Sequence, residues 1–376
     1  MFCLIKNIHV FQPEDAGVMD ILVCGDRIAA VGKDLAAEVS GVEVTVVDGS
    51  GLMALPGFMD QHVHITGGGG ESSFKSRIRE ITSEDIVEGG VTTVVGLLGT
   101  DSTTRSVENL LAKTKALNEE GLTAFCLTGA YTYPSPTLTG SVTKDIAFIQ
   151  EIIGCKLAIT DHRSSEITRD ELKRLATQVR MASLLSGKVG VLHMHTGSGK
   201  QGLSDVIAAV EESNVPIKHF RPTHCGHLVE DAVAFANMGG YIDFTAGNAE
   251  KTAKILAGVL ERAPYDRVTL SSDSNGSMPI WNEKKELIGM GVGKITILYD
   301  TIRYLITEMG MEVPKAAGLI TANVAKALEM YPKKGCLAPG SDADITILDS
   351  DYRIDSVMAG GKWLQMHKKI EKISMY

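Results

Sequence analysis

The middle of the chain alternates between short apolar segments and longer amphipathic segments, and this alternation limits the fold more than any other feature. Between the apolar segments, stretches such as 106–120, 170–185 and 203–213 repeat apolar residues with a helical period. Continuous apolar strands that alternate with helices indicate a parallel sheet covered on both faces. The strand candidates are 52–64, 91–97, 122–128, 155–160, 189–195, 218–224, 241–246 and 267–273. Eight such units predict an α/β fold, a (β/α)8 TIM-type barrel, with a longer helical region over 284–330 covering the last strand.

Both ends of the chain have a different pattern. Residues 1–55 and 335–376 consist of short strand-like segments with turn signals, for example Gly25-Asp26 between two apolar runs. We predict that residues 1–55 and 335–376 together form one small β-sandwich domain, and that residues 56–334 form the barrel.

The composition and charge exclude several classes of protein. With 376 residues, of which 44% are hydrophobic and 22% charged, the chain matches an ordinary globular protein and not a disordered, collagenous or coiled-coil one. The net charge of −9 argues against nonspecific nucleic-acid binding, which needs clustered Lys and Arg. No apolar run approaches the roughly 18 residues of a membrane span. We therefore expect no nucleic-acid partner and no membrane partner.

The sequence also favours a cytoplasmic location. Its N-terminal segment lacks the basic region, the long apolar region and the cleavage site of a signal peptide. The six cysteines form no C-x-x-C pair, and several lie in apolar strand-like runs. We expect buried free thiols in preference to disulfides, and free thiols are typical of the reducing cytoplasm.

Most of the ten histidines stand at, or just past, the end of a predicted strand. The carboxyl ends of barrel strands open onto one face, where active sites form, whereas scattered core histidines would show no such bias. His62 and His64 form an H-x-H pair on one side of a strand, and two such imidazoles can ligate one metal ion. Alone, this pair is equally consistent with solvated histidines. His193, His224 and Asp273 at three further strand ends favour a metal centre.

Lys156 is an unusual residue for its position, because it lies within the apolar run IIGCKLAIT. A buried lone ammonium is costly and tends to lose its proton. The neutral amine can take up carbon dioxide and form a carbamate, whose two oxygens can bridge two metal ions. Position alone favours a lysine that extends to solvent from a strand end. The four histidines and the aspartate shift the interpretation to the bridging role.

Several segments resemble bacterial isoaspartyl (β-aspartyl) dipeptidases of the amidohydrolase superfamily. The resemblance covers most of the chain, including the split β domain, and it is carried by PGFMDQHVHITGGGGE, VVGLLGTDSTTR, LTGAYTYPSPTLTGS, IIGCKLAITDHRS and LSSDSNGS. It implies a binuclear zinc peptidase that hydrolyses the β-aspartyl amide bond of dipeptides through a metal-bridging hydroxide, and a homo-oligomer. A hydroxide between two zinc ions is a nucleophile at neutral pH.

The same resemblance implies roles for individual residues. One zinc would bind His62, His64 and Asp273, the other would bind His193 and His224, and N6-carboxylated Lys156 would bridge the two Zn²⁺ ions. Asp273 would also move the proton of the attacking water to the leaving amine.

Substrate contacts are implied in the loops that follow the strands. Tyr131 would donate to the developing oxyanion, Glu71 would receive the α-amine, and Arg163 would hold the α-carboxylate. From the residues alone, Tyr131 is more simply a packed loop residue. Three further contacts are expected from Gly69, Thr100 and Ser277.

The chain departs from the family pattern at three places. His227 stands where the family carries an arginine that helps to grip the substrate carboxylate, and histidine is only partly charged at pH 7. The segment 72–80 after Glu71 also differs from the Pro/Thr-rich segment common in the family. It carries Lys75, Arg77 and Arg79, which could supply a replacement cation. His195 is additional, and we interpret it as a supporting or loop residue in preference to a metal ligand.

Two alternatives follow from these departures. One is an amidohydrolase that acts on another small amide, either a cyclic amide or an N-acyl amino acid. The other is a non-catalytic barrel that serves as a scaffold, although such relatives usually lose ligands and this sequence retains every ligand type.

Overall fold

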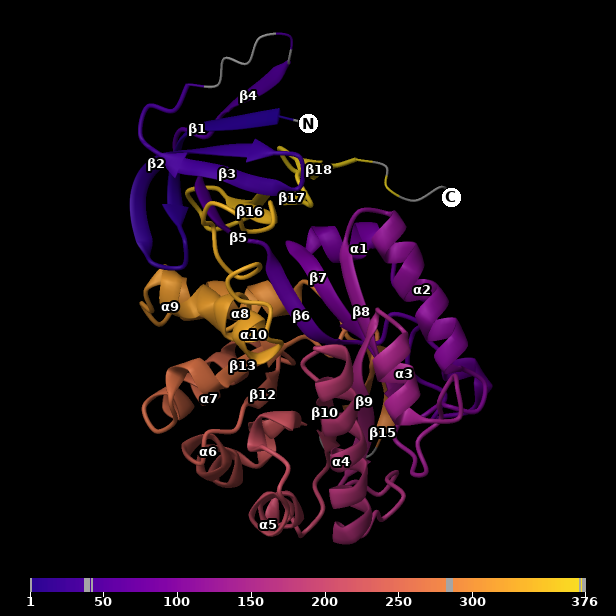
Figure 1. The fold of residues 1–376 in the computed structure, drawn as a ribbon. Coiled ribbons are helices and arrows are strands. Elements are labelled where there is room, and N and C mark those ends of the chain that lie inside the picture. The colour runs from indigo at the N-terminus through magenta and orange to yellow at the C-terminus, as the bar shows by residue number, and fades with distance from the viewer. Residues whose placement is uncertain (1, 37–40, 42, 282–286, 372, 374–376) are drawn as a thin grey trace.

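The computed structural model describes residues 2–36, 41, 43–281, 287–371 and 373. A β-rich part that contains both chain ends lies beside a larger part in which strands alternate with helices (Figure 1).

The two chain ends join in one nine-stranded sheet. Its order is β19-β18-β17-β16-β5-β1-β2-β3, with β4 paired to β1. The two ends meet where β5 and β16 run antiparallel, with Pro56 opposite Ile345. Apolar side chains such as Ile5, Ile21 and Met358 are fully buried in this part. The strands are β1 (Phe2–Phe11), β2 (Asp15–Cys24), β3 (Arg27–Gly32), β4 (Val44–Asp48), β5 (Met53–Pro56), β16 (Ile345–Leu348), β17 (Ile354–Ala359), β18 (Lys362–Met366) and β19 (Lys369–Ile370).

The larger part contains the eight parallel strands that the sequence predicts. They are β6 (Phe58–Val63), β7 (Val91–Gly96), β8 (Thr123–Gly129), β9 (Ile152–Ile159), β10 (Val191–Thr196), β11 (Phe220–Thr223), β12 (Ile242–Thr245) and β13 (Val268–Ser271). Strands β6 to β11 form one sheet in sequence order, and β12 pairs with β13. β11 lies next to β12, β13 lies next to β6, and a parallel bridge joins Val63 to Ser274. The α/β architecture is thus confirmed, while the closed barrel, the sandwich form of the small part and the domain boundaries remain predictions.

Helices follow the strands and cover the parallel sheet on its outside (Figure 1). Five of them begin after a Ser, Thr or Asn whose side chain accepts a backbone N–H of the first turn, which satisfies one of the free donors there. The α-helices are α1 (Ser83–Glu88), α2 (Val107–Glu119), α3 (Val142–Phe148), α4 (Arg169–Ser186), α5 (Ser204–Glu212), α6 (Val229–Asn237), α7 (Ala249–Leu260), α8 (Ile297–Thr307), α9 (Val313–Gly318) and α10 (Ala322–Ala327).

The predicted helical region over 284–330 is wrong at its start. Residues 282–286 lie outside the described residues, but 287–292 form strand β15 (Leu287–Val292), which pairs antiparallel with β14 (Ser277–Trp281). The first helix of the region, α8, begins only at Ile297. Three glycines alternate with other residues at positions 289, 291 and 293, and this period of two with poor helix formers explains the hairpin.

Two further expectations can be compared with the structure. All six cysteines are free thiols, and five of them are buried. In the described part of the chain, we find no helix with both the length and the apolar character needed to cross a membrane.

Candidate metal centre

The predicted ligands lie on the parallel strands or directly after them. Lys156 and His193 stand within β9 and β10, so the prediction that His193 marks a strand end is wrong, because β10 continues to Thr196. The other four stand at or just past the carboxyl end of a strand. Because these strands run in one direction, their carboxyl ends lie on one side of the sheet. The register of β9 and β10 sets Lys156 beside His193, so that the two side chains leave the sheet at the same level. The six side chains come from β6 (His62), the residue after β6 (His64), β9 (Lys156), β10 (His193), the residue after β11 (His224) and the turn after β13 (Asp273).

His62 lies at the centre of this group. Its Nδ1 atom is 2.9 Å from Nε2 of His193, and its Nε2 atom is 3.4 Å from Nζ of Lys156. The ring centroids of His62 and His224 are 4.8 Å apart. His193, Lys156 and His224 therefore all lie close to the His62 ring.

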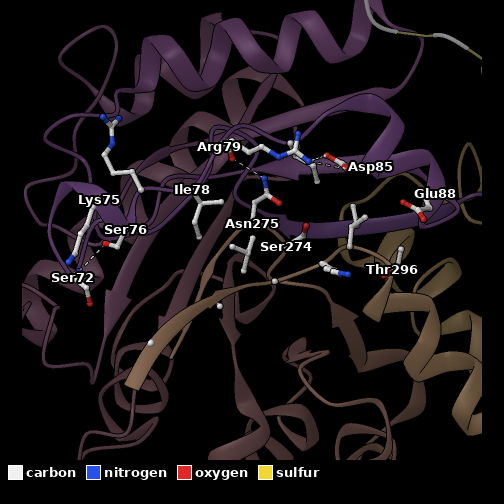
Figure 2. A pocket seen from close by; sticks show the side chains of 18 residues that line it. Ser72, Lys75, Ser76, Ile78, Arg79, Asp85, Glu88, Ser274, Asn275 and Thr296 are labelled. Atoms are coloured by element: carbon white, nitrogen blue, oxygen red, sulfur yellow. Dashed lines mark hydrogen bonds and ion pairs between the residues drawn. The ribbon is translucent and has the colours of Figure 1, made fainter. Parts of the chain in front are cut away.

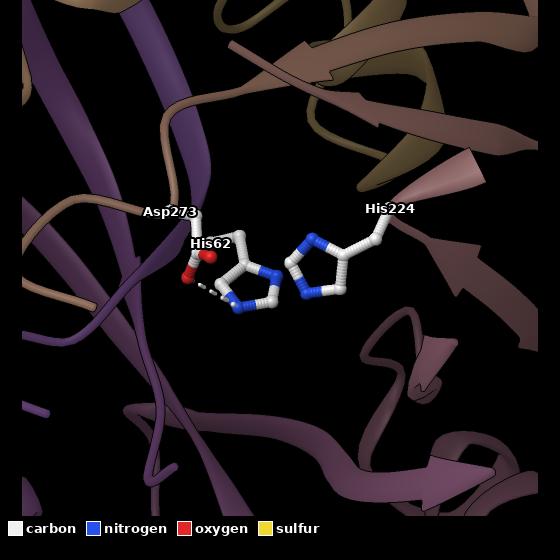
Figure 3. Close-up of side chains that lie close together, drawn as sticks. All are labelled: His62, His224 and Asp273. Atoms are coloured by element: carbon white, nitrogen blue, oxygen red, sulfur yellow. Dashed lines mark ion pairs between the residues drawn. The ribbon is translucent and has the colours of Figure 1, made fainter. Parts of the chain in front are cut away.

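Asp273 completes the group on the Nε2 side of His62, where Lys156 also lies. Its Oδ1 atom is 3.3 Å from Nε2 of His62 and 3.1 Å from Nε2 of His64. The candidate ligand atoms of His62, His224 and Asp273 all lie within 4.8 Å of one another, and Figure 3 shows these three side chains converging. Of the six predicted ligands, none lies apart from the cluster.

Two observations indicate that this cluster fits a metal ion. Within the described residues, Oδ1 of Asp273 and Nδ1 of His64 are buried polar atoms without a hydrogen-bond partner, which is costly unless something else satisfies them. His224 and Asp273 also have positive φ angles of 62° and 54°, a strained backbone that concentrates at functional sites. Imidazole nitrogen and carboxylate oxygen together suit zinc.

Burial keeps the nitrogen donors in the form that binds metal. It lowers the pKa of Lys156 to about 7 and that of His62 to about 3, and it holds the pKa values of His193 and His224 well below the usual range. Burial opposes ionisation of Asp273, but the neighbouring imidazoles outweigh it and hold its pKa well below the usual value. Metal ligands must be deprotonated, so these side chains are in the protonation state that binds metal near neutral pH.

A small cavity of about 50 Å³ opens beside Asp273 and His64. With the exception of His227, every predicted substrate residue lines it: Gly69, Glu71, Thr100, Tyr131, Arg163 and Ser277. His227 lies outside this lining, and its Nε2 atom is 2.8 Å from the carbonyl oxygen of Gly197.

Glu71 makes hydrogen bonds to three other residues that line the cavity. Its Oε1 atom accepts hydrogen bonds from Thr100 Oγ1 (3.1 Å), Ser277 Oγ (2.9 Å) and Arg163 Nη1 (3.3 Å). The preceding loop needs glycine, because a Cβ at Gly69 would meet a backbone oxygen at 2.3 Å and its φ is +80°. The structure therefore brings the predicted anion and the predicted cation for a zwitterionic substrate into contact.

A hydrogen-bonded chain runs along the other wall of the cavity. Arg163 donates to both carboxylate oxygens of Asp161, and Asp161 Oδ2 lies 2.8 Å from His195 Nε2. His195 Nδ1 lies 2.7 Å from the Tyr131 hydroxyl. The sequence alone gives Asp161 no partner and indicates only a supporting or loop role for His195, because no residue pattern reveals a contact between the turn after β9 and a side chain of β10.

The cationic segment after Glu71 lies near two other cavities. Arg77 lines one of about 290 Å³ that shares Gly69, Glu71 and Thr100 with the small cavity. Lys75, Arg77 and Arg79 also line a larger cavity, of about 1010 Å³, whose lining includes Ser274 and Asn275 (Figure 2). Of the three cations, Arg77 is therefore the one that borders the cavity adjoining the candidate site.

Comparisons with known proteins agree with this geometry. The sequence model of the amidohydrolase family matches residues 53–364. The crystal structure of a β-aspartyl dipeptidase from Fervidobacterium islandicum AW-1, in complex with β-Asp-Leu dipeptide, superposes with a TM-score of 0.93; it is 39% identical, and the match covers 100% of both chains. L-hydantoinase of Paenarthrobacter aurescens is 24% identical over 97% of this chain and 89% of its own length. A D-hydantoinase structure, 17% identical with a TM-score of 0.71, covers 98% of this chain and 96% of its own and shares the fold.

The family match spans most of the chain, and the resemblance to β-aspartyl dipeptidases extends over its whole length. The chain therefore belongs to the amidohydrolase family, resembles its β-aspartyl dipeptidases and is a metal-dependent hydrolase.

Proposed function

We propose that the protein hydrolyses the β-aspartyl amide bond of dipeptides at a binuclear zinc centre. The observation that carries the proposal is the contact of Glu71 with Arg163, 3.3 Å apart, in a cavity that borders the metal-donor cluster. An isoaspartyl dipeptide has a free α-amine and a free α-carboxylate next to the scissile bond. A carboxylate and a guanidinium side by side are complementary to that pair of charges.

Following the resemblance to the family, we assign the donor set to two zinc ions. His62, His64 and Asp273 would hold one ion, His193 and His224 would hold the other, and Lys156, carboxylated on Nζ, would bridge them. When bound, two zinc ions supply an activated water and polarise the scissile carbonyl.

Side chains of the cavity would perform the remaining steps. Glu71 would accept the α-amine, and the N–H groups of Arg163 that Asp161 leaves free would bind the α-carboxylate. The Tyr131 hydroxyl would donate to the carbonyl oxygen as negative charge develops there. Asp273 would take the proton of the attacking water and pass it to the leaving amine, so that one water and one amide give one carboxylic acid and one amine.

A second candidate function is hydrolysis of a cyclic amide. The match to L-hydantoinase over nearly the whole chain favours it, as does a match to the dihydroorotase of Aquifex aeolicus, 26% identical over 92% of this chain and 89% of its own length. An N-acyl amino acid would fit the same chemistry, because it also presents an amide next to a carboxylate.

A substrate panel separates these functions. We expect zinc-loaded protein to hydrolyse β-Asp-Leu and to leave α-Asp-Leu, hydantoin, dihydroorotate and N-acetyl-leucine intact, since only the first offers both charges at the right distance from the amide. The α-linked isomer is the matched control, because it has the same composition. Turnover of hydantoin or dihydroorotate without turnover of β-Asp-Leu would overturn the proposal in favour of the alternative. A protein that binds less than one zinc per chain after treatment with zinc and bicarbonate would instead support the scaffold.

We further propose that the protein works in the cytoplasm as a homo-oligomer. The six free thiols suit a reducing compartment. Exposed apolar side chains at the carboxyl ends of α3 and α4 supply a surface suited to contact with a second copy of the chain.

A further inference from the structure

His195 borders the candidate site, but none of the proposed steps uses it. It lies on β10, two residues after His193, opposite Ala158 of β9, and it is 8% exposed. Its ring centroid is 4.5 Å from that of Tyr131 and 4.5 Å from that of His224. A buried imidazole at this position needs an explanation, because alternation along the strand directs it to the same side as the candidate ligand His193.

The contacts of His195 fix the direction of each hydrogen bond. Three N–H groups of Arg163 donate to Asp161: Nε and the backbone nitrogen to Oδ1, at 2.9 and 2.8 Å, and Nη2 to Oδ2, at 2.8 Å. A carboxylate held in this way is ionised and only accepts hydrogen bonds. His195 Nε2, 2.8 Å from Oδ2, must therefore carry the hydrogen, because Nη2 of Arg163, 3.4 Å from Nε2, makes its shorter contact with the same Oδ2. In the neutral ring Nδ1 is then the acceptor for the Tyr131 hydroxyl at 2.7 Å.

This arrangement separates His195 from the candidate ligands. Both of its ring nitrogens have protein partners, so neither has a free lone pair for a cation. His64, in contrast, keeps an unpartnered Nδ1 atom within the described part of the chain. At rest the single hydrogen of the phenol points to Nδ1 of His195. Donation to a substrate oxygen would therefore need the O–H bond to rotate away from His195, while the hydroxyl oxygen keeps its place.

We propose that His195 is a positioning residue that holds the Tyr131 hydroxyl in place through a chain that begins at Arg163 and passes through Asp161. The inference rests on the proposed hydrolytic function, in which Tyr131 contacts the carbonyl oxygen. It also connects the residue that would bind the substrate carboxylate to the residue that would bind the oxyanion. Placement of a catalytic group matters because errors of about 1 Å can cost about 100-fold in rate.

The first test compares three substitutions of His195 in zinc-loaded protein. His195→Asn places an amide oxygen near the position of Nδ1, whereas His195→Gln extends toward the position of Nε2 and keeps only the contact with Asp161. We expect kcat for β-Asp-Leu to fall about 10-fold in His195→Ala and His195→Gln, to stay within about threefold of wild type in His195→Asn, and KM to change little. Bound zinc should be unchanged in all three. Loss of zinc, or equal loss of kcat in His195→Asn and His195→Gln, would overturn the inference.

The second test asks whether His195 acts through Tyr131. In a Tyr131→Phe background, His195→Ala should cause no further fall in kcat, because the group that it positions is already absent. An equal 10-fold fall in both backgrounds would show that His195 acts by another route. If wild-type protein does not hydrolyse β-Asp-Leu at all, the proposed function fails; if it does and His195→Ala has no effect, only the positioning role fails.

A spectroscopic measurement tests the hydrogen-bond chain without activity. In protein labelled with ¹⁵N-histidine, we expect His195 to be neutral with its hydrogen on Nε2, and Asp161→Asn to disturb that signal. An Nδ1–H tautomer, or a His195 signal that shifts to a metal-bound value on addition of zinc, would contradict the assignment.

Discussion

At the scale of single residues, Lys156 is a cationic residue type in a fully buried position. Its Nζ atom is 3.4 Å from Nε2 of His62, and burial lowers its pKa to about 7. An amine in this state is available for reaction with carbon dioxide, and the resulting carbamate would supply the anionic bridge that four neutral imidazoles lack.

We expect Lys156→Ala to lose most of its zinc and about 100-fold or more in kcat for β-Asp-Leu, because the bridge disappears. Acetate or propionate should partly restore both, since they can enter the space that alanine leaves. Lys156→Met is the matched control, because it fills that space without an amine and should not respond to the acids. Zinc analysis and turnover of the three proteins decide the matter, and a full complement of zinc in Lys156→Met would refute the bridge.

Residue types and spacing were sufficient to predict the ligand cluster, but not the contacts around it. Each of the six candidate ligands lies on a parallel strand or directly after one, and parallel strands bring these positions together whatever the loops do. The contact between Asp161 and His195 depends instead on how the turn after β9 folds back over β10, and local patterns do not encode this. His227 contacts Gly197 and does not line the cavity. Its position was not predicted either, because it also depends on how the segments after the strands fold.

At the scale of elements, the predicted strands agree with the structure where apolar runs are continuous. The segment predicted over 52–64 is in fact two strands, because Gly57 separates β5 from β6 and the chain passes there from one sheet to the other. The hairpin of β14 and β15 was missed, since its glycines and short strands resemble neither a buried strand nor an amphipathic helix. Patterns of period and polarity thus predict the buried elements better than those that border the site.

The change of sheet at Gly57 can be tested by substitution. A Cβ there would lie 2.3 Å from Oγ1 of Thr92 and 3.0 Å from Cβ of Asp344, so Gly57→Ala forces these buried neighbours apart. We expect the free energy of unfolding to fall by about 1–3 kcal/mol, as for other overpacked sites. Gly247→Ala is the control, because nothing lies within 4 Å of its added Cβ. Denaturant unfolding measures both, and equal stabilities would contradict the packing argument.

At the scale of the whole molecule, the exposed apolar side chains at the ends of α3 and α4 stand out. Phe148 is 81% exposed and Leu185 is 70% exposed, with Met181 and Leu184 on the same part of α4. The two helices pack against each other, and Lys188 Nζ donates to the carbonyl oxygen of Ile149, so these side chains belong to one surface. Apolar surface of this kind typically marks a contact with another chain.

We expect wild-type protein to form a homo-oligomer, and Phe148→Glu with Leu185→Glu to dissociate it, because the charges could not be buried in a contact. Val46→Glu is the control: Val46 is 64% exposed on β4, outside this surface, and its substitution should leave the assembly intact. Light scattering after size exclusion gives the masses. A monomeric wild-type protein, or an oligomer that survives the double substitution, would assign another role to the surface.

The central claim is that two metal ions share one set of six side chains, and anomalous diffraction at the zinc edge tests it most directly. In crystals of protein treated with zinc and bicarbonate, we predict two peaks about 3.5–4 Å apart. One should contact His62, His64 and Asp273, the other His193 and His224, with added density on Nζ of Lys156 between them. A single peak, or peaks bound by residues outside this set, would contradict the account.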